Sequence, residues 1–148
     1  MNKKITSKRH GIDLYKIITF PSADTKNGVL YMMQHDDTGK ESAVPFMVKR
    51  TLVMKGMNGH DKRGAHTHHK TNQILICISG TCDVDLDDGE RRETVRLDSP
   101  NKGLLLYPYV WHVMHNFAPG TILLDLTDSE YDERDYIRNY EDFLQQLQ

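Results

Sequence analysis

Short apolar segments recur along most of the chain, and a run rich in glycine, proline, asparagine or aspartate ends each of them. Segments of alternating or β-branched apolar residues bounded by such turn residues are typical of strands in a sandwich or barrel. Strands are predicted at 15–20, 29–34, 46–54, 73–79, 82–86, 91–97, 103–107, 110–117 and 121–126. The pattern predicts an all-β fold in which 29–34 is the antiparallel partner of 15–20.

The end of the chain follows a different period. Its apolar residues, which recur at helical spacing, are Tyr136, Ile137, Tyr140, Phe143, Leu144 and Leu147. The acidic residues Asp132, Glu133 and Asp135 precede them and suit a helix N-terminus. The spacing predicts an amphipathic C-terminal α-helix that packs on the sandwich or on a second subunit.

Length and charge narrow the class of protein. A chain of 148 residues with no dividing linker is expected to form one domain, 1–148. Its formal net charge of -2 gives no reason to expect a nucleic-acid partner, and no segment is long and apolar enough to span a membrane. Residues 5–10 lack the apolar core of a signal peptide, so we expect a cytoplasmic protein whose Cys77 and Cys82 remain thiols.

The segment 63–70 gathers most of the chemistry. Its sequence, Arg63-Gly64-Ala65-His66-Thr67-His68-His69-Lys70, places three imidazoles, a guanidinium and an ammonium within a few residues. Side chains alternate along a strand, so an extended segment points His66 and His68 to one face and His69 to the other. A second polar candidate is Arg50, on an otherwise apolar face of 46–54, which fits either ligand binding or a rim or ion-pair position.

Eight residues resemble the two sequence motifs of the cupin superfamily. They are His66, His68, Gln73, Gly80, Gly103, Pro108, His112 and Asn116. The resemblance implies a double-stranded β-helix, or jelly roll, with His66, His68, Gln73 and His112 lining its interior. Many cupins hold iron or manganese there, but Gln73 stands at the position of the acidic ligand, and a neutral amide binds a divalent cation less well than a carboxylate. We therefore expect no metal and no other cofactor, although three histidines alone can hold zinc.

A closer resemblance covers roughly the last two thirds of the chain. The segments 63–70, 73–82, 86–89, 97–100, 103–104, 110–117 and 131–140 are similar to the thymidine-diphosphate 4-keto-6-deoxyglucose 3,4-ketoisomerases. These cupins act in the biosynthesis of 3-amino-3,6-dideoxy sugars for bacterial glycans. The chain departs from the family at Asn27-Gly28, where the family has Arg-Gly, and at 51–53, where the family has tyrosines, one of which is thought to assist catalysis.

This resemblance implies a homodimeric isomerase that moves the keto group of a dTDP-linked 4-keto-6-deoxy sugar from C4 to C3 through an enediol(ate). His66 is assigned as the base that takes the C3 proton, and His68 as its partner. The residues expected to bind substrate are Arg50, Arg63, Lys70, Gln73, Tyr107, Trp111, His112 and His115, of which the aromatics and His115 fit ordinary packing equally well. The alternatives are a metal-dependent cupin such as a dioxygenase and a non-catalytic sugar-nucleotide-binding module.

Overall fold

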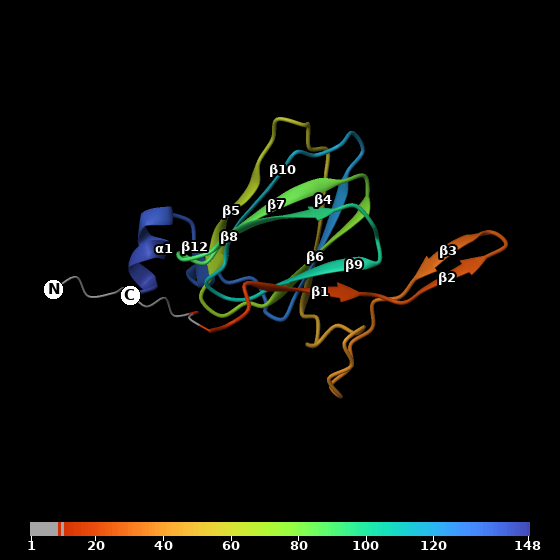
Figure 1. Cartoon of the computed structure of the whole chain (residues 1–148), viewed down its shortest axis with the longest axis horizontal. Coiled ribbons are helices and arrows are strands. Elements are labelled where there is room, and N and C mark those ends of the chain that lie inside the picture. Colours follow the sequence, from red (N-terminus) through yellow and green to blue (C-terminus); the bar gives the residue numbers. More distant parts are fainter. Residues whose placement is uncertain (1–8, 10) are drawn as a thin grey trace.

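The computed structural model describes Arg9 and residues 11–148, so the segment 5–10 considered as a signal peptide lies, except for Arg9, outside the described residues. Twelve strands and two short helical segments follow one another along this part of the chain (Figure 1). They are β1 (Tyr15–Thr19), β2 (Ser22–Thr25), β3 (Gly28–Tyr31), β4 (Arg50–Lys55), β5 (Arg63–His68), β6 (Gln73–Ser79), β7 (Cys82–Asp87), β8 (Arg92–Leu97), β9 (Lys102–Leu106), β10 (Trp111–His115), β11 (Ile122–Thr127), the 3-10 helix η1 (Glu133–Asp135), β12 (Tyr136–Ile137) and α1 (Tyr140–Gln146).

Two five-stranded antiparallel sheets form the body of the protein. The first has the order β1-β9-β6-β11-β4 and the second the order β12-β5-β10-β7-β8. Most neighbouring strands are far apart in the sequence, as in a jelly roll, so the predicted all-β fold with a C-terminal helix is confirmed. Among the described residues, no helix is long and apolar enough to cross a membrane.

The two faces of the first sheet are covered differently. On β6, Leu75 and Cys77 face the second sheet and belong to the main interior cluster. Ile74 and Ile76 point outward and are covered by Phe46 and neighbouring apolar residues of the segment that precedes β4. The strand predicted at 46–54 therefore begins only at Arg50, because the earlier half of its apolar pattern packs over the outside of the sheet.

The predicted pairing of 29–34 with 15–20 is wrong. β1 pairs with β9, while β3 pairs with β2 in a separate hairpin that extends away from the two sheets (Figure 1). The register places Thr25 opposite Gly28, so Lys26 and Asn27 alone form the turn. Such a short loop joins strands that are adjacent in the sequence, and the polar run 22–25 that reads as a turn is itself the first strand of the hairpin.

The predicted helix begins later than expected. Tyr136 and Ile137 are not helical but form β12, which pairs with His68 and Thr67 at the end of β5. α1 starts after Asn139, whose side chain accepts a hydrogen bond from the backbone N–H of Asp142 at 3.0 Å. Ile137 and Phe143 still pack together, since a spacing of six residues can be spanned by a strand and a turn as well as by a helix.

Candidate active site

Three histidines meet on the inner face of the second sheet. His66 and His68 come from β5 and His112 from β10, where it lies directly opposite His66. The ring centroid of His66 lies 5.1 Å from that of His68 and 4.7 Å from that of His112. His68 and His112 are buried and His66 is half-buried. The three side chains converge, as the sequence predicted.

A backbone irregularity just before His66 shapes this cluster. Gly64 and Ala65 have φ values of 82° and 55°, and the register between β5 and β10 shifts between His112 and Val113. A Cβ on Gly64 would lie 2.8 Å from the carbonyl oxygen of His112, so only glycine fits this close approach. Bulges of this kind re-aim side chains, and here the bulge separates the exposed Arg63 from the histidines that follow it.

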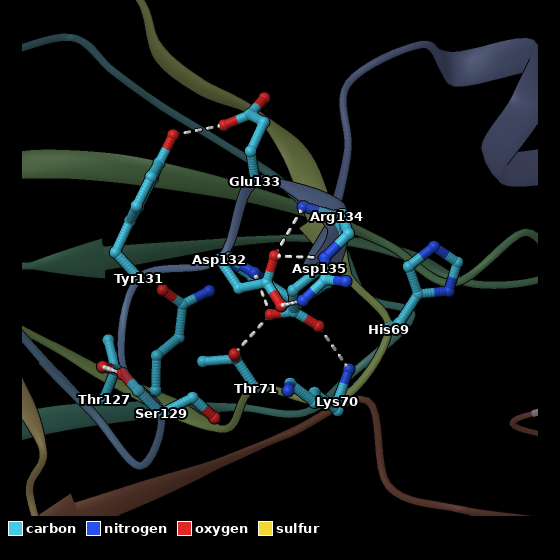
Figure 2. A network of polar contacts seen from close by, with 12 residues as sticks. His69, Lys70, Thr71, Thr127, Ser129, Tyr131, Asp132, Glu133, Arg134 and Asp135 are labelled. Carbon is cyan, nitrogen blue, oxygen red and sulfur yellow. Dashed lines mark hydrogen bonds and ion pairs between the residues drawn. The ribbon is translucent and has the colours of Figure 1, made fainter.

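A buried carboxylate holds the second histidine. Asp135 Oδ2 lies 2.9 Å from His68 Nδ1, and both side chains are 3 % exposed. The same carboxylate accepts hydrogen bonds from the backbone N–H of Lys70 at 2.8 Å and from the Thr71 hydroxyl (Figure 2). With its Nδ1–H donated to Asp135, His68 keeps the lone pair of Nε2 for another proton.

The turn that carries Asp135 is fixed by its own hydrogen bonds. Asp132 caps η1 by accepting from the backbone N–H of Arg134 at 3.0 Å, and β12 then ties the chain to the end of β5. In the sequence, Asp135 fitted the acidic start of a helix, and no pattern indicated a partnership with His68, which lies 67 positions away. Its place in the 131–140 run, which carries the family resemblance, was the only available signal.

Hydrogen bonding and burial set the charges of this group. Burial alone would raise the pKa of Asp135, but the bonds from Thr71 and Lys70 and the nearby His68 bring it below its ordinary value. Burial lowers the pKa of His68, and Asp135 works against that effect. Burial and the neighbouring His68 lower the pKa of His66 to about 4. The cluster at neutral pH is thus an ionised carboxylate with neutral imidazoles.

His112 is buried, and both of its ring nitrogens have hydrogen-bond partners. Its Nδ1 lies 3.1 Å from the carbonyl oxygen of Val110, and its Nε2 lies 3.2 Å from Gln73 Nε2. If Nδ1–H donates to the carbonyl, Nε2 accepts from the Gln73 amide. Burial, together with the two other histidines, places the pKa of His112 well below its ordinary value, so this ring is neutral.

The three histidines also satisfy a simple distance criterion for a metal ion. One ring nitrogen of each lies within 4.8 Å of the others. Imidazole suits zinc and similar cations, but the Gln73 amide already occupies the Nε2 lone pair of His112 and supplies no charge. A metal would need Gln73 to turn away, so the donor set fits a cation poorly as it stands.

Two cations predicted to bind substrate lie near the cluster. Arg50, half-buried on β4, has its guanidinium 5.6 Å from the ring centroid of Tyr131, and its charge lowers the pKa of His68. Its Nε and Nη1 are buried without a hydrogen-bond partner. Lys70 lies two residues after the end of β5 and is exposed, while its backbone N–H donates to Asp135.

Four other predicted residues lie apart from the histidines. Trp111 and His115 point to the outer face of β10, where Trp111 packs on Phe143 and His115 lies 2.9 Å from Asp85. Tyr107 follows β9 and has the Arg9 guanidinium 5.1 Å from its ring centroid. With the exposed Arg63 beyond the bulge, these residues do not join the histidine cluster within this chain, and their binding roles remain predictions.

Fold and site together define a cupin-type jelly roll with a histidine cluster inside the barrel. The chain matches the family described as "FdtA: WxcM-like, C-terminal" over residues 13–148. It is 38% identical, over 86% of this chain and 88% of the relative, to TDP-4-oxo-6-deoxy-alpha-D-glucose-3,4-oxoisomerase of Aneurinibacillus thermoaerophilus. The chain belongs to this family of sugar 3,4-ketoisomerases, as the sequence motifs predicted.

Solved structures agree with this assignment. A mutant of the 3,4-ketoisomerase QdtA from Thermoanaerobacterium thermosaccharolyticum, crystallised with TDP-4-keto-6-deoxyglucose, has a TM-score of 0.83 and 32% identity, covering 90% of this chain and 94% of that one. The TDP-quinovose 3,4-ketoisomerase WlaRB from Campylobacter jejuni has a TM-score of 0.81 and 36% identity, covering 90% and 99%.

Proposed function

We propose that the protein is an isomerase that moves the keto group of a dTDP-linked 4-keto-6-deoxyhexose from C4 to C3. The observation that carries this proposal is the buried His68–Asp135 pair beside His66, in a chain 38% identical to a TDP-sugar 3,4-oxoisomerase. The reaction shifts a proton between carbons and leaves the sugar's oxidation level unchanged, so positioned acid and base groups suffice for it.

The geometry favours His68 rather than His66 as the base that takes the C3 proton. A base gains strength when a carboxylate stabilises its protonated form, and among the three histidines His68 alone hydrogen-bonds one. His66 has no such partner, and its pKa of about 4 makes it a weak base. We assign His66 to contacts with the sugar oxygens, which reverses the two roles expected from the resemblance.

The proposed reaction has two proton transfers at carbon. His68 Nε2 removes the C3 proton, the C3–H electrons form a C3=C4 double bond, and the former C4 carbonyl oxygen gains a proton. The imidazolium of His68 then returns a proton to C4 as the O3 hydroxyl becomes the new ketone and releases its proton, which balances the proton gained by O4. Arg50, whose unpartnered nitrogens lie near His68, is suited to stabilise the negative charge of the intermediate.

One cationic residue near the cluster suits the substrate's diphosphate. Lys70 is exposed two residues beyond the end of β5, whereas Arg63 is exposed at the other end of this strand, apart from the histidines. Phosphate oxygens accept charge-assisted hydrogen bonds from both residue types. We assign Lys70 to the diphosphate, Arg50 to the charge of the intermediate, and Gln73 and His112 to the wall of the sugar site, while a binding role for Arg63 stays a prediction from the resemblance.

We infer that the protein acts as a homodimer. The β2–β3 hairpin, with the residue after it, exposes apolar side chains: Val29, Leu30, Tyr31 and Met32 are 37–58% exposed. A two-stranded hairpin alone is marginally stable in water. A second copy would cover these side chains, and Leu30→Asp is expected to shift the mass measured by light scattering from dimer to monomer.

Proton NMR of the product tests the proposed activity. Incubation with TDP-4-keto-6-deoxyglucose is expected to convert the 4-keto sugar into its 3-keto isomer, and an unchanged substrate would contradict the proposal. The second candidate is a metal-dependent cupin, favoured by the spacing of the three histidines. A stoichiometric transition metal in protein purified without chelators, together with loss of activity on its removal, would support that candidate.

The free, buried Cys77 and Cys82 suit the reducing cytoplasm to which we assign the reaction.

A further inference from the structure

One buried acid in the barrel is not used by the residues described above. Asp125 lies on β11, opposite Leu52 of β4 and Leu75 of β6. Cross-strand partners point to the same face of a sheet, and Leu75 belongs to the interior cluster, so the Asp125 side chain points into the barrel. It is only 8% exposed.

Nothing in the described part of the chain satisfies this carboxyl group. Its Oδ1 is buried without a hydrogen-bond partner, and both cross-strand neighbours are leucines. Buried polar atoms are nearly always hydrogen-bonded, because an unpaired one costs about 1–3 kcal/mol. An acid left in this state inside a barrel is expected to meet a polar group of the ligand.

The position of Asp125 connects it to the reaction site. Thr127 is the next inward-facing residue of β11, about 7 Å along the strand, and pairs with both Arg50 and Gln73. Gln73 in turn contacts His112 of the opposite sheet. Asp125 therefore lies across the barrel from the histidines, on the sheet that supplies Gln73.

Arg50 is close enough to act electrostatically on both His68 and Asp125. Its charge contributes to the lowered pKa of His68 and partly opposes the rise that burial causes in the pKa of Asp125. Yet Arg50 Nε and Nη1 and Asp125 Oδ1 are all buried without hydrogen bonds, so the two side chains do not neutralise each other by direct contact. Both are left free to contact a bound molecule.

Burial lets this acid keep its proton up to near-neutral pH. It raises the pKa of Asp125 to about 7, against the opposing effect of Arg50, the charged group that acts on it. A carboxylic acid that is half protonated near neutral pH can both donate and accept a proton during one reaction cycle.

We propose that Asp125 is a second catalytic residue, which carries the hydroxyl proton between O4 and O3 of the sugar while His68 moves the carbon-bound proton. This role rests on the proposed isomerase activity. As His68 breaks the C3–H bond, the Asp125 carboxyl protonates O4 of the forming enediol. Its carboxylate then takes the proton from O3 as the C3 ketone forms and C4 is protonated by His68. Both residues end the cycle in their starting states, and no co-reactant is consumed.

The test compares Asp125→Asn with Asp98→Asn, which changes an exposed aspartate after β8. Each is incubated with TDP-4-keto-6-deoxyglucose in deuterated water, and proton NMR follows both isomerisation and deuterium exchange at C3. Asp125→Asn is expected to lower the isomerisation rate about 100-fold or more. Exchange should fall less, because forming the enediolate needs His68 alone, whereas completing the isomerisation also needs the proton moved between the oxygens. Asp98→Asn should match the wild type in both rates.

The pH dependence supplies a second readout that a purely structural role would not move. Wild-type kcat should fall as the pH rises through about 7, where Asp125 loses its proton. The histidines of the cluster titrate below their ordinary values and cannot produce this fall. The falling limb should persist in Asp125→Glu and vanish in Asp125→Asn, and the wild-type profile remains informative even if a variant folds poorly.

The outcomes separate the two proposals. If the wild type is active and Asp125→Asn keeps both its rate and the falling limb of its pH profile, the role of Asp125 is refuted and the isomerase function stands. A wild type that neither exchanges nor isomerises the sugar refutes the isomerase function, and the role of Asp125 with it.

Discussion

Two aspartates that are shielded from solvent, Asp135 in η1 and Asp125 on β11, have opposite pKa shifts. As whole residues they are 5% and 8% exposed. Asp135 bonds His68 of β5 in the second sheet, and Asp125 lies on β11 in the first sheet. Asp135 accepts hydrogen bonds from His68, Thr71 and the backbone of Lys70, and its pKa is lowered. Asp125 Oδ1 accepts none, and its pKa is raised to about 7. Burial raises the pKa of Asp125, whereas the hydrogen bonds that Asp135 accepts outweigh its burial and keep its pKa low.

This difference divides the chemistry between the two sides of the barrel. An ionised Asp135 fixes the Nδ1–H tautomer of His68 and stabilises its protonated form. A neutral Asp125 has a proton to give. Pairs of titratable groups whose environments push their pKa values apart are a recurrent way to run acid and base steps at one pH.

The largest expected effect comes from removing the base that Asp135 supports. His68→Asn should lower kcat by about 10³- to 10⁴-fold, because the proton transfer at C3 loses its acceptor. Binding of TDP, measured by calorimetry, should be retained. His66→Asn, the matched variant on the same strand, should lose less activity while also keeping TDP binding. A greater loss in His66→Asn would return the role of base to His66.

Stability tests the Asp125 side of the comparison. Its folded-state pKa of about 7 lies above the ordinary aspartate value of 3.8, so the folded state holds the proton more tightly than the unfolded state. Wild-type stability should therefore decline between about pH 4 and pH 7 relative to Asp125→Asn, by at most about 4 kcal/mol. Urea unfolding at pH 4 and pH 8 measures this difference, and an advantage of the Asn variant that does not grow with pH would contradict it.

A change at Asp135 should have a smaller effect on rate and the opposite effect on pH dependence. Asp135→Asn is expected to lower kcat about 100-fold, because His68 loses the charge that supports its protonation. The lowered folded pKa means that Asp135 contributes stability above its unfolded pKa and loses it as the pH falls through the folded value. The melting temperature of the wild type should thus fall below about pH 4. This part of the fall should be absent from Asp135→Asn.

The smallest effect is expected from one donor to Asp135. Thr71→Val removes the hydroxyl that bonds this carboxylate and should cost about 1 kcal/mol of stability, with a modest fall in kcat. Thr94→Val, which removes an exposed bond to Asp85 at 2.7 Å, is the control and should cost less. Equal losses in the two variants would indicate that the buried network has no special importance.

The sequence predicted the strands of the barrel and the shared face of His66 and His68, because both follow from the alternation of side chains along strands. It did not predict β12, since Tyr136 and Ile137 also fit a helical spacing with Tyr140. Asp135 was missed for the same reason. Asp125 was missed because a lone acid between Leu124 and Leu126 looks like any alternating strand position. Whether a buried acid has a partner depends on distant residues that local patterns do not contain.

A carboxyl titration followed by carbon-13 NMR tests the comparison most directly. Protein labelled in its aspartate carboxyl carbons would be titrated from pH 2 to 9, with the signals assigned from Asp125→Asn and Asp135→Asn. We predict that Asp125 titrates near pH 7 and that Asp135 stays ionised to below its ordinary pKa. A normal, low midpoint for Asp125, or a raised one for Asp135, would contradict the division of roles between the two acids.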